Sequence, residues 1–187
     1  MKDLIKKLLR ETLEEIAEKP VFGSGWHHNI YTSNQYPDRL YKVGNSKTVN
    51  EWVRIFKAYP KYFPKIYRVF PYKKNPYYTV VEIEKLNTEK GSREFKKIDD
   101  FLFDEAGGME CNDGFISILD FFEVDCYEIL KDTAYEYNKN FAIILDKWVK
   151  FLQEVAPIIK MQLGRDLDLH VGNVAYDAQG NLKLIDI

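Results

Sequence analysis

The sequence predicts an α+β protein with a β-rich first part and a mainly helical second part that ends in a β-hairpin. Short β-prone runs bounded by turn residues recur within residues 21–83, helical apolar periodicity prevails within residues 92–161, and two more β-prone runs close the chain. A length of 187 residues with 45% apolar residues is enough to fill a core in one domain or in two tightly packed lobes.

The chain lacks the marks of a membrane or secreted protein. No apolar run approaches the roughly twenty residues that a membrane span needs. Residues 1–19 are too charged for the apolar core of a secretory signal. Cys111 and Cys126 show neither C-x-x-C spacing nor histidine partners, so we expect reduced, buried thiols. These features predict cytoplasmic residence and no membrane association.

Charge is unevenly distributed along the chain. Residues 1–98 carry 20 Lys and Arg against 11 Asp and Glu, whereas residues 99–187 carry 7 against 18. The net charges of the two parts are therefore +9 and −11, which sum to the −2 of the whole chain. Solvated surfaces explain such a pattern, and a boundary between two lobes near residue 97 explains it as well.

Residues 1–19 have the pattern of an amphipathic helix. Its apolar stripe comprises Leu4, Ile5, Leu8, Leu9, Leu13, Ile16 and Ala17. We expect the stripe to pack against the following lobe, and a dimer seam or a membrane-surface helix are the alternatives.

Residues 21–31 have the pattern of a strand, a glycine-rich turn and a second strand, with Gly23, Ser24 and Gly25 in the turn. Lys42 lies in the next β-prone run. Glycines in a turn allow the backbone to approach a phosphate group closely. In the alternative interpretation, the turn is an ordinary tight turn and Lys42 is a surface residue on an edge strand.

Helical periodicity with Glu51 in its first turns predicts a helix over residues 49–59. Two strands follow over residues 63–70 and 77–83, separated by a turn-rich segment. Glu51 is the candidate partner for a lysine, although a surface glutamate is also favoured near a helix N-terminus.

The second part is predicted to be mainly helical. Residues 92–106 indicate one helix, and residues 114–131 indicate either a helix or an irregular insertion. Residues 135–161 predict a long helix that is interrupted near Pro157.

The chain ends in a predicted hairpin whose polar residues lie at its edges. Residues 173–177 and 182–187 are β-prone and flank a turn with Gly and Asn. Asp168 precedes Asn173 by five positions, and Asp186 follows Asn173 by thirteen. Two carboxylates and an amide can order a hydroxyl group and hold a hard divalent cation through oxygen ligands. Alternatively, the Asp and Asn side chains only cap turns.

This spacing resembles that of the protein-kinase-like superfamily, in which D-x-x-x-x-N is followed by a metal-binding Asp after a hairpin. Residues 165–167 (RDL) imitate the H-R-D-L string of eukaryotic protein kinases. However, only Asp168 precedes Asn173 by the five positions that the kinase pattern requires. Leu167 then takes the place of the Arg that reads activation-loop phosphorylation in many kinases. The D-L-H-x-G-N string is most similar to aminoglycoside-phosphotransferase-like kinases and small bacteriophage protein kinases.

The resemblance implies an ATP- and Mg²⁺-dependent phosphotransferase, with a Ser/Thr protein kinase of the phage type as the leading possibility. Asp168 would orient the acceptor hydroxyl, and Asn173 and Asp186 would ligate the metal. Lys42, held by Glu51, would bind phosphates beneath the glycine-rich turn.

The resemblance also implies an adenine site. Val81 would border it, and the backbone C=O of Glu82 and N–H of Glu84 would hydrogen-bond the adenine edge.

The same resemblance divides the chain into an N-terminal helix (1–19), a kinase-like N-lobe with helix C (20–86) and a C-lobe (87–187) that carries the catalytic hairpin (165–187). Because the chain ends one residue after Asp186, we expect a reduced C-lobe that lacks the activation segment. A phage-encoded protein would act in the host cytoplasm.

The sequence is also compatible with other functions. A small-molecule kinase of the aminoglycoside-phosphotransferase type is one alternative. A pseudokinase, or an acidic module that binds and inhibits a host protein, is another. Residues 99–128 hold ten acidic residues between Asp99 and Glu128 and no basic residue. They are either a solvated face or a landing surface for a basic host protein or a cationic substrate. The sequence has no Walker A string, zinc-ligand cluster or basic-aromatic platform, so we expect no direct nucleic-acid binding.

Overall fold

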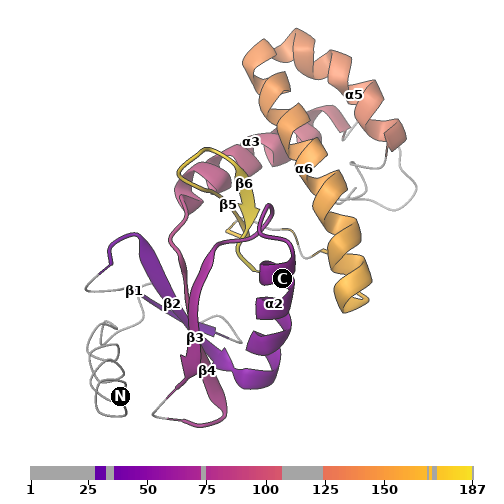
Figure 1. Ribbon diagram of the computed structural model, residues 1–187. Helices are drawn as coiled ribbons and strands as arrows, with labels where there is room; N and C mark the ends of the chain where they lie inside the picture. Colours follow the sequence, from indigo (N-terminus) through magenta and orange to yellow (C-terminus); the bar gives the residue numbers. More distant parts are fainter. Residues whose placement is uncertain are drawn as a thin grey trace. The chain divides into compact units, whose positions relative to one another are not determined.

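The computed structural model describes residues 28–32, 36–72, 75–106, 124–167, 169 and 172–186. The chain divides into two compact units, Met1–Leu86 and Asn87–Ile187, whose elements are labelled in Figure 1. The first unit contains a sheet and a helix, and the second contains helices and a two-stranded hairpin. The prediction of an α+β protein is thereby confirmed.

Four antiparallel strands form the sheet of the first unit. The strands are β1 (His28–Thr32), β2 (Arg39–Asn45), β3 (Ile66–Pro71) and β4 (Tyr78–Glu84). Their order is β1-β2-β4-β3, so β2 and β4 are central. Alternating β-prone residues predict β2, β3 and β4 to within a few residues.

Helix α2 (Ser46–Ala58) follows β2 directly. It begins where the side chain of Asn45 accepts a hydrogen bond from the backbone N–H of Lys47 at 3.0 Å. Its buried face consists of Val49, Trp52, Val53, Ile55 and Phe56. This face contacts the sheet, and the ring of Phe56 stacks on that of Phe63 at a centroid distance of 4.5 Å.

A second layer of side chains forms a small core with Tyr41, Val43 and Val80 at its centre. The partly buried rings of Tyr31, Phe70, Tyr72 and Tyr78 pack around these residues. Tyr41 and Val43 alternate with Lys42 along β2, so this core and Lys42 belong to opposite faces of the sheet.

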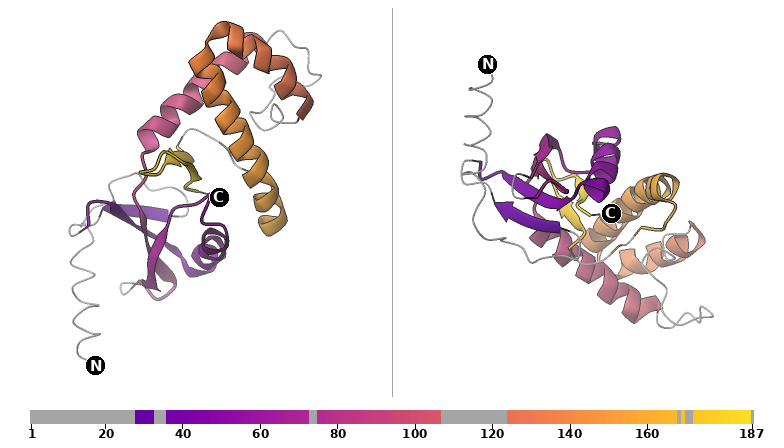
Figure 2. Two further views of the ribbon diagram at one scale, coloured as in Figure 1. Left: turned by 45° about the horizontal axis from the view of Figure 1, so that its top comes forward. Right: turned by 90° about the horizontal axis from the view of Figure 1, so that it is seen from below.

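The second unit is built on three helices and a hairpin. The helices are α3 (Thr88–Ala106), α5 (Val124–Tyr137) and α6 (Lys139–Leu163), and the hairpin comprises β5 (Val174–Tyr176) and β6 (Leu182–Leu184). Helix α3 contacts β5, and α5 contacts α6; the left view of Figure 2 shows the hairpin beside α3. Phe101 of α3 and Phe141 of α6 lie with ring centroids 4.8 Å apart.

Two helix predictions for the second unit need correction. Helix α5 extends to Tyr137, and a separate helix begins after Asn138, whose side chain accepts from the backbone N–H groups of Asn140 and Phe141. Helix α6 also continues through Pro157 to Leu163, where an interruption was predicted. Val155 and Ile159 on either side of the proline are buried, so packing of the apolar face keeps the helix continuous.

Several predicted features lie outside the described residues. These are the N-terminal helix, the first predicted strand, the turn of residues 23–25, Cys111 and most of the acidic stretch. Within the described helices, none combines the length and the apolar character that crossing a membrane requires.

Candidate functional site

The hairpin register places Asn173 and Asp186 at the same open end. Val174 is opposite Leu184, and the backbone N–H of Ile185 donates to the carbonyl oxygen of Asn173 at 2.9 Å. Asp186 therefore leaves the hairpin directly beside the segment that enters it. The side chain of Asn173 is buried, and that of Asp186 is partly buried. The structure thus places the backbones of the two predicted metal ligands at the same end of the hairpin.

The closed end of the hairpin is organised by Asp177. Its carboxylate accepts hydrogen bonds from the backbone N–H groups of Gln179 and Asn181, at 3.0 and 2.7 Å. Burial raises the pKa of the Asp177 carboxyl group, but hydrogen bonds from Asn181 and the nearby Lys183 ammonium outweigh it and hold the pKa below its ordinary value. Gly180 has a φ of 82°, which favours glycine at this turn position. The turn therefore fixes the register that aligns the open end.

The segment that leads to the hairpin is anchored at the end of α6 and within the RDL string. Helix α6 ends at Leu163 and is capped by Gly164, which has a φ of 66° and donates its N–H to the carbonyl of Lys160. Asp166 forms an ion pair with Lys160 at 2.8 Å and is largely exposed. Leu167 is buried. The predicted catalytic Asp168 comes next in the chain and lies outside the described residues.

Lys42 of β2 is buried on the side of the sheet that faces α2. Lys42 is only 2% exposed, and its ammonium nitrogen lies 5.0 Å from the centroid of the Trp52 ring. In the register of β2 and β4, Lys42 is directly opposite Val81. The structure therefore brings the predicted phosphate-binding lysine and the predicted adenine-pocket residue side by side.

The predicted lysine partner Glu51 has a different position. It lies on the exposed side of α2, whereas Trp52, the next residue, is buried and faces Lys42. Successive residues of a helix point about 100° apart, so both cannot face the same strand. The aromatic ring, rather than the carboxylate, is the group that α2 presents to Lys42.

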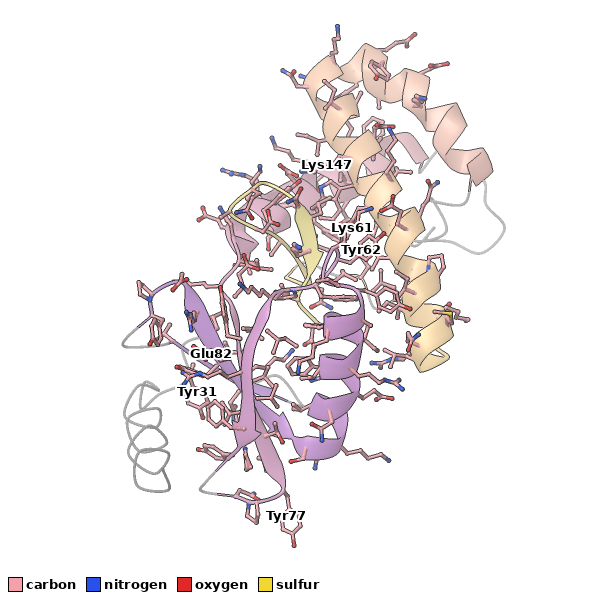
Figure 3. All side chains as sticks on the ribbon, in the orientation of Figure 1. Tyr31, Lys61, Tyr62, Tyr77, Glu82 and Lys147 are labelled. Carbon is pink, nitrogen blue, oxygen red and sulfur yellow. The ribbon has the colours of Figure 1, made fainter. Side chains whose placement is uncertain are left out.

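Glu82 is fully buried in β4 and is paired in the sheet with Tyr41 on one side and Arg68 on the other. Its carboxylate forms ion pairs with Arg39, at 2.9 Å, and with Arg68. The guanidinium group of Arg39 also lies over two tyrosine rings. The side chain, labelled in Figure 3, therefore stabilises the sheet, a role that the sequence pattern did not reveal.

The predicted adenine contact at Glu84 requires a correction. The backbone N–H of Glu84 donates to the carbonyl of Lys65 at 2.9 Å, and its carboxylate accepts from the backbone N–H of Lys65 at 3.2 Å. Strand β4 extends to Glu84 and is paired there with Arg39. The N–H that was expected to bind adenine is thus used by the sheet, because the strand ends one residue later than predicted.

A buried polar cluster in the second unit was not predicted. Glu94 of α3 accepts hydrogen bonds from Trp148 of α6 and Tyr176 of β5. Burial and the bond to Glu94 raise the pKa of the Tyr176 hydroxyl group. Burial and the nearby Lys90 lower the pKa of Lys147. The partners are 54 and 82 residues apart in sequence, so local patterns carry no signal for this cluster.

The donor chemistry at the open end of the hairpin suits Mg²⁺. An amide oxygen from Asn173 and a carboxylate from Asp186 are the hard oxygen ligands that this ion prefers. Among the residues that the structure describes, no group of three or more His, Cys, Asp and Glu side chains could hold a metal ion. The pair at the hairpin offers two protein ligands, which is a common number for Mg²⁺ sites that also bind substrate phosphates.

No known family model matches the chain, and a search of curated proteins found no match. Any functional assignment must therefore rest on the residues themselves. Of the predicted site, the backbone register of the second unit places Asn173 and Asp186 at one end of the hairpin, and that of the first unit places Lys42 opposite Val81.

Proposed function

We propose that the chain is an ATP- and Mg²⁺-dependent phosphotransferase of the protein-kinase-like type. The observation that carries the proposal is the hairpin register, which sets an amide and a carboxylate at one open end. Asp168 precedes this Asn by five positions, the interval between catalytic Asp and metal-binding Asn in protein kinases.

The first unit supports the proposal independently. In protein kinases, the phosphate-binding lysine lies on a strand that is followed by a helix whose glutamate pairs with the lysine. Here the strand with Lys42 is central in the sheet and is followed directly by α2, which presents Trp52 to the lysine in place of Glu51. Lysine is rarely so completely buried, and Lys42 is 2% exposed. A surface lysine on an edge strand does not account for this position.

Each residue then has a definite task. Asp168 accepts a hydrogen bond from the acceptor hydroxyl and orients it, and Lys42 neutralises phosphate oxygens. Asn173 and Asp186 would hold Mg²⁺, which supplies positive charge to the phosphates when it is bound. The D-L-H string suits small hydroxylated molecules as well as protein side chains as the phosphate acceptor.

The experiment that tests the proposal follows labelled γ-phosphate from ATP. The protein is incubated with Mg²⁺, labelled ATP and a cell lysate, and the label is traced in proteins, in small metabolites and in the chain itself. We expect Lys42→Met to reduce transfer by about a hundredfold, which is typical when a group that stabilises developing charge is removed.

The matched control is Lys47→Met, which removes an exposed lysine from the first turn of α2. Its transfer rate should equal that of the wild type. Label in metabolites alone would identify a small-molecule kinase. ATP binding without any transfer would refute the enzymatic proposal and identify a nucleotide-binding module.

A further inference from the structure

Three elements of the second unit meet at one buried carboxylate. Glu94 of α3 is 8% exposed and accepts a hydrogen bond from Nε1 of Trp148 on α6 at 3.0 Å. It also accepts one from the hydroxyl group of Tyr176 on β5. A buried carboxylate is costly unless it is hydrogen-bonded. Because its two donors come from different elements, Glu94 links α3, α6 and β5 through a single side chain.

Two lysines reinforce this link around the Tyr176 ring. The ammonium nitrogens of Lys90 on α3 and Lys147 on α6 lie 4.2 and 4.4 Å from the ring centroid. Lys147, labelled in Figure 3, also donates to the carbonyl of Gly180 in the hairpin turn at 2.6 Å. Both helices therefore contact the hairpin at β5, and α6 reaches its turn as well.

The backbone contacts place β5 closely against α3. The N–H of Asn87 donates to the carbonyl of Tyr176 at 2.8 Å, and the N–H of Tyr176 donates back to Asn87 at 3.1 Å. A Cβ atom on Gly91 would lie only 2.1 Å from the carbonyl oxygen of Val174. The polar cluster thus acts on a strand that begins one residue after Asn173.

We propose that Glu94 is a positioning residue for the site at the hairpin, an inference that rests on the proposed function. Through Tyr176 and Trp148 it fixes the hairpin, and with it Asn173 and Asp186, against α6, the helix that leads into the segment with Asp168. Apolar packing alone would hold these elements together without setting a direction, whereas hydrogen bonds to one carboxylate are directional. Glu94 contacts neither substrate nor metal in this proposal.

The test measures the hairpin directly by amide hydrogen exchange. The reporter is the N–H of Ile185, which donates to the carbonyl oxygen of Asn173 at the open end of the hairpin. The internal reference is the N–H of Ala142, which donates to Asn138 in the first turn of α6. In Tyr176→Phe, we expect exchange at Ile185 to rise by about tenfold, as the loss of one buried hydrogen bond predicts, while Ala142 keeps its rate.

A second measurement asks whether the metal pair is displaced. The Mg²⁺ concentration for half-maximal ATP binding should rise by about tenfold in Tyr176→Phe, a typical effect of losing a residue that orients metal ligands. Glu94→Gln, which keeps the size of the side chain, is the second variant if Tyr176→Phe does not fold. Phe101→Leu is the matched control, since it weakens aromatic packing of α3 on α6 away from the hairpin.

Three outcomes would overturn the inference. In the first, amide exchange at Ile185 in Tyr176→Phe rises no more than exchange at Ala142. In the second, exchange at Ile185 rises equally in Phe101→Leu when both variants lose the same stability. The Mg²⁺ requirement could also stay unchanged although the hairpin loosens. If the wild type binds no Mg²⁺-ATP, the proposed function fails, but the exchange rates still decide whether Glu94 positions the hairpin.

Discussion

Lys42 is the residue whose surroundings bear most directly on the proposed binding of a nucleotide. Its ammonium group lies beside the Trp52 ring, while Glu51 is exposed. A lysine over an aromatic face is stabilised by about 1 kcal/mol, and more when the pair is desolvated. In the proposed phosphotransferase, the tryptophan would provide part of the restraint that a glutamate provides in protein kinases.

This arrangement predicts different effects for two neighbouring substitutions. Trp52→Leu should weaken Mg²⁺-ATP binding by about fivefold, corresponding to about 1 kcal/mol, and Trp52→Phe should give an intermediate affinity. Glu51→Gln should change the affinity less than about twofold, as expected for an exposed charge. Calorimetric titration of folded variants measures all three affinities. A large loss in Glu51→Gln together with wild-type affinity in Trp52→Leu would restore the glutamate as the partner.

The raised pKa of Tyr176 predicts that the free energy of unfolding depends on pH. Its pKa is raised above the ordinary value of 10.0 in the folded protein, through burial and the bond to Glu94. The unfolded chain therefore releases the proton first as pH rises, so the stabilisation by the protonated hydroxyl is complete below about pH 10 and is lost progressively above it.

The measurement compares the unfolding free energies of the wild type and Tyr176→Phe between about pH 8 and about pH 11. We expect the wild type to be more stable at the lower pH and its advantage to shrink as the pH increases. An advantage that grows with pH would show that the hydroxyl is not protonated in the folded state.

The hairpin and α3 show how one glycine positions an element. Gly91 leaves room for the carbonyl oxygen of Val174, and the neighbouring Ser92 is less buried. Gly91→Ala should reduce the unfolding free energy by about 1–3 kcal/mol, because the new methyl group overlaps backbone that must shift. Ser92→Ala on the same helix should change it by less than about 0.5 kcal/mol. Urea denaturation measures both, and equal stabilities of the two variants would contradict the close approach of β5 to α3.

Local chemistry explains which elements could be predicted from the sequence. Alternating apolar residues and turn residues indicate β2, β3, β4 and the final hairpin, because strand period and turn conformation are local properties. The break between α5 and α6 was missed although Asn138 is a typical helix cap. The predicted interruption at Pro157 was wrong, because the buried residues around the proline keep α6 continuous.

The site was predictable only where its residues are close in sequence. The interval from Asp168 to Asn173 and the hairpin before Asp186 can be read from one short segment. The cluster around Glu94 joins residues from three distant segments. The hydrogen bond from the backbone N–H of Glu84 to the carbonyl of Lys65 depends on where β4 ends. Such contacts are set by tertiary packing, which sequence patterns do not report.

For the molecule as a whole, the acidic stretch of residues 99–128 predicts a basic protein partner whose binding depends on salt. Asp99, Asp100 and Asp104 are exposed on α3, while the rest of the acidic stretch lies mostly outside the described residues. If these residues recruit a basic protein, replacing Asp99, Asp100, Asp104 and Glu105 with Asn or Gln should slow its capture and leave ATP affinity unchanged. Exposed charges are screened over about 8 Å near physiological salt, so capture should also weaken as salt increases.

Pull-downs from lysate at low and high salt compare the wild type with this neutralised variant. The expected result is a basic protein that the wild type retains only at low salt and that the variant loses. The same set of captured proteins in all samples would mean that the acidic face is simply solvated.

The most direct test of the phosphotransferase assignment separates nucleotide affinity from phosphate transfer in three single variants. Asp186→Asn should weaken Mg²⁺-dependent ATP binding, whereas Asp168→Asn should bind ATP like the wild type and lose transfer, because only the first residue is assigned to the metal. Asp166→Asn, the largely exposed neighbour paired with Lys160, should retain both properties. Transfer that survives in Asp168→Asn but disappears in Asp166→Asn would contradict the assignment.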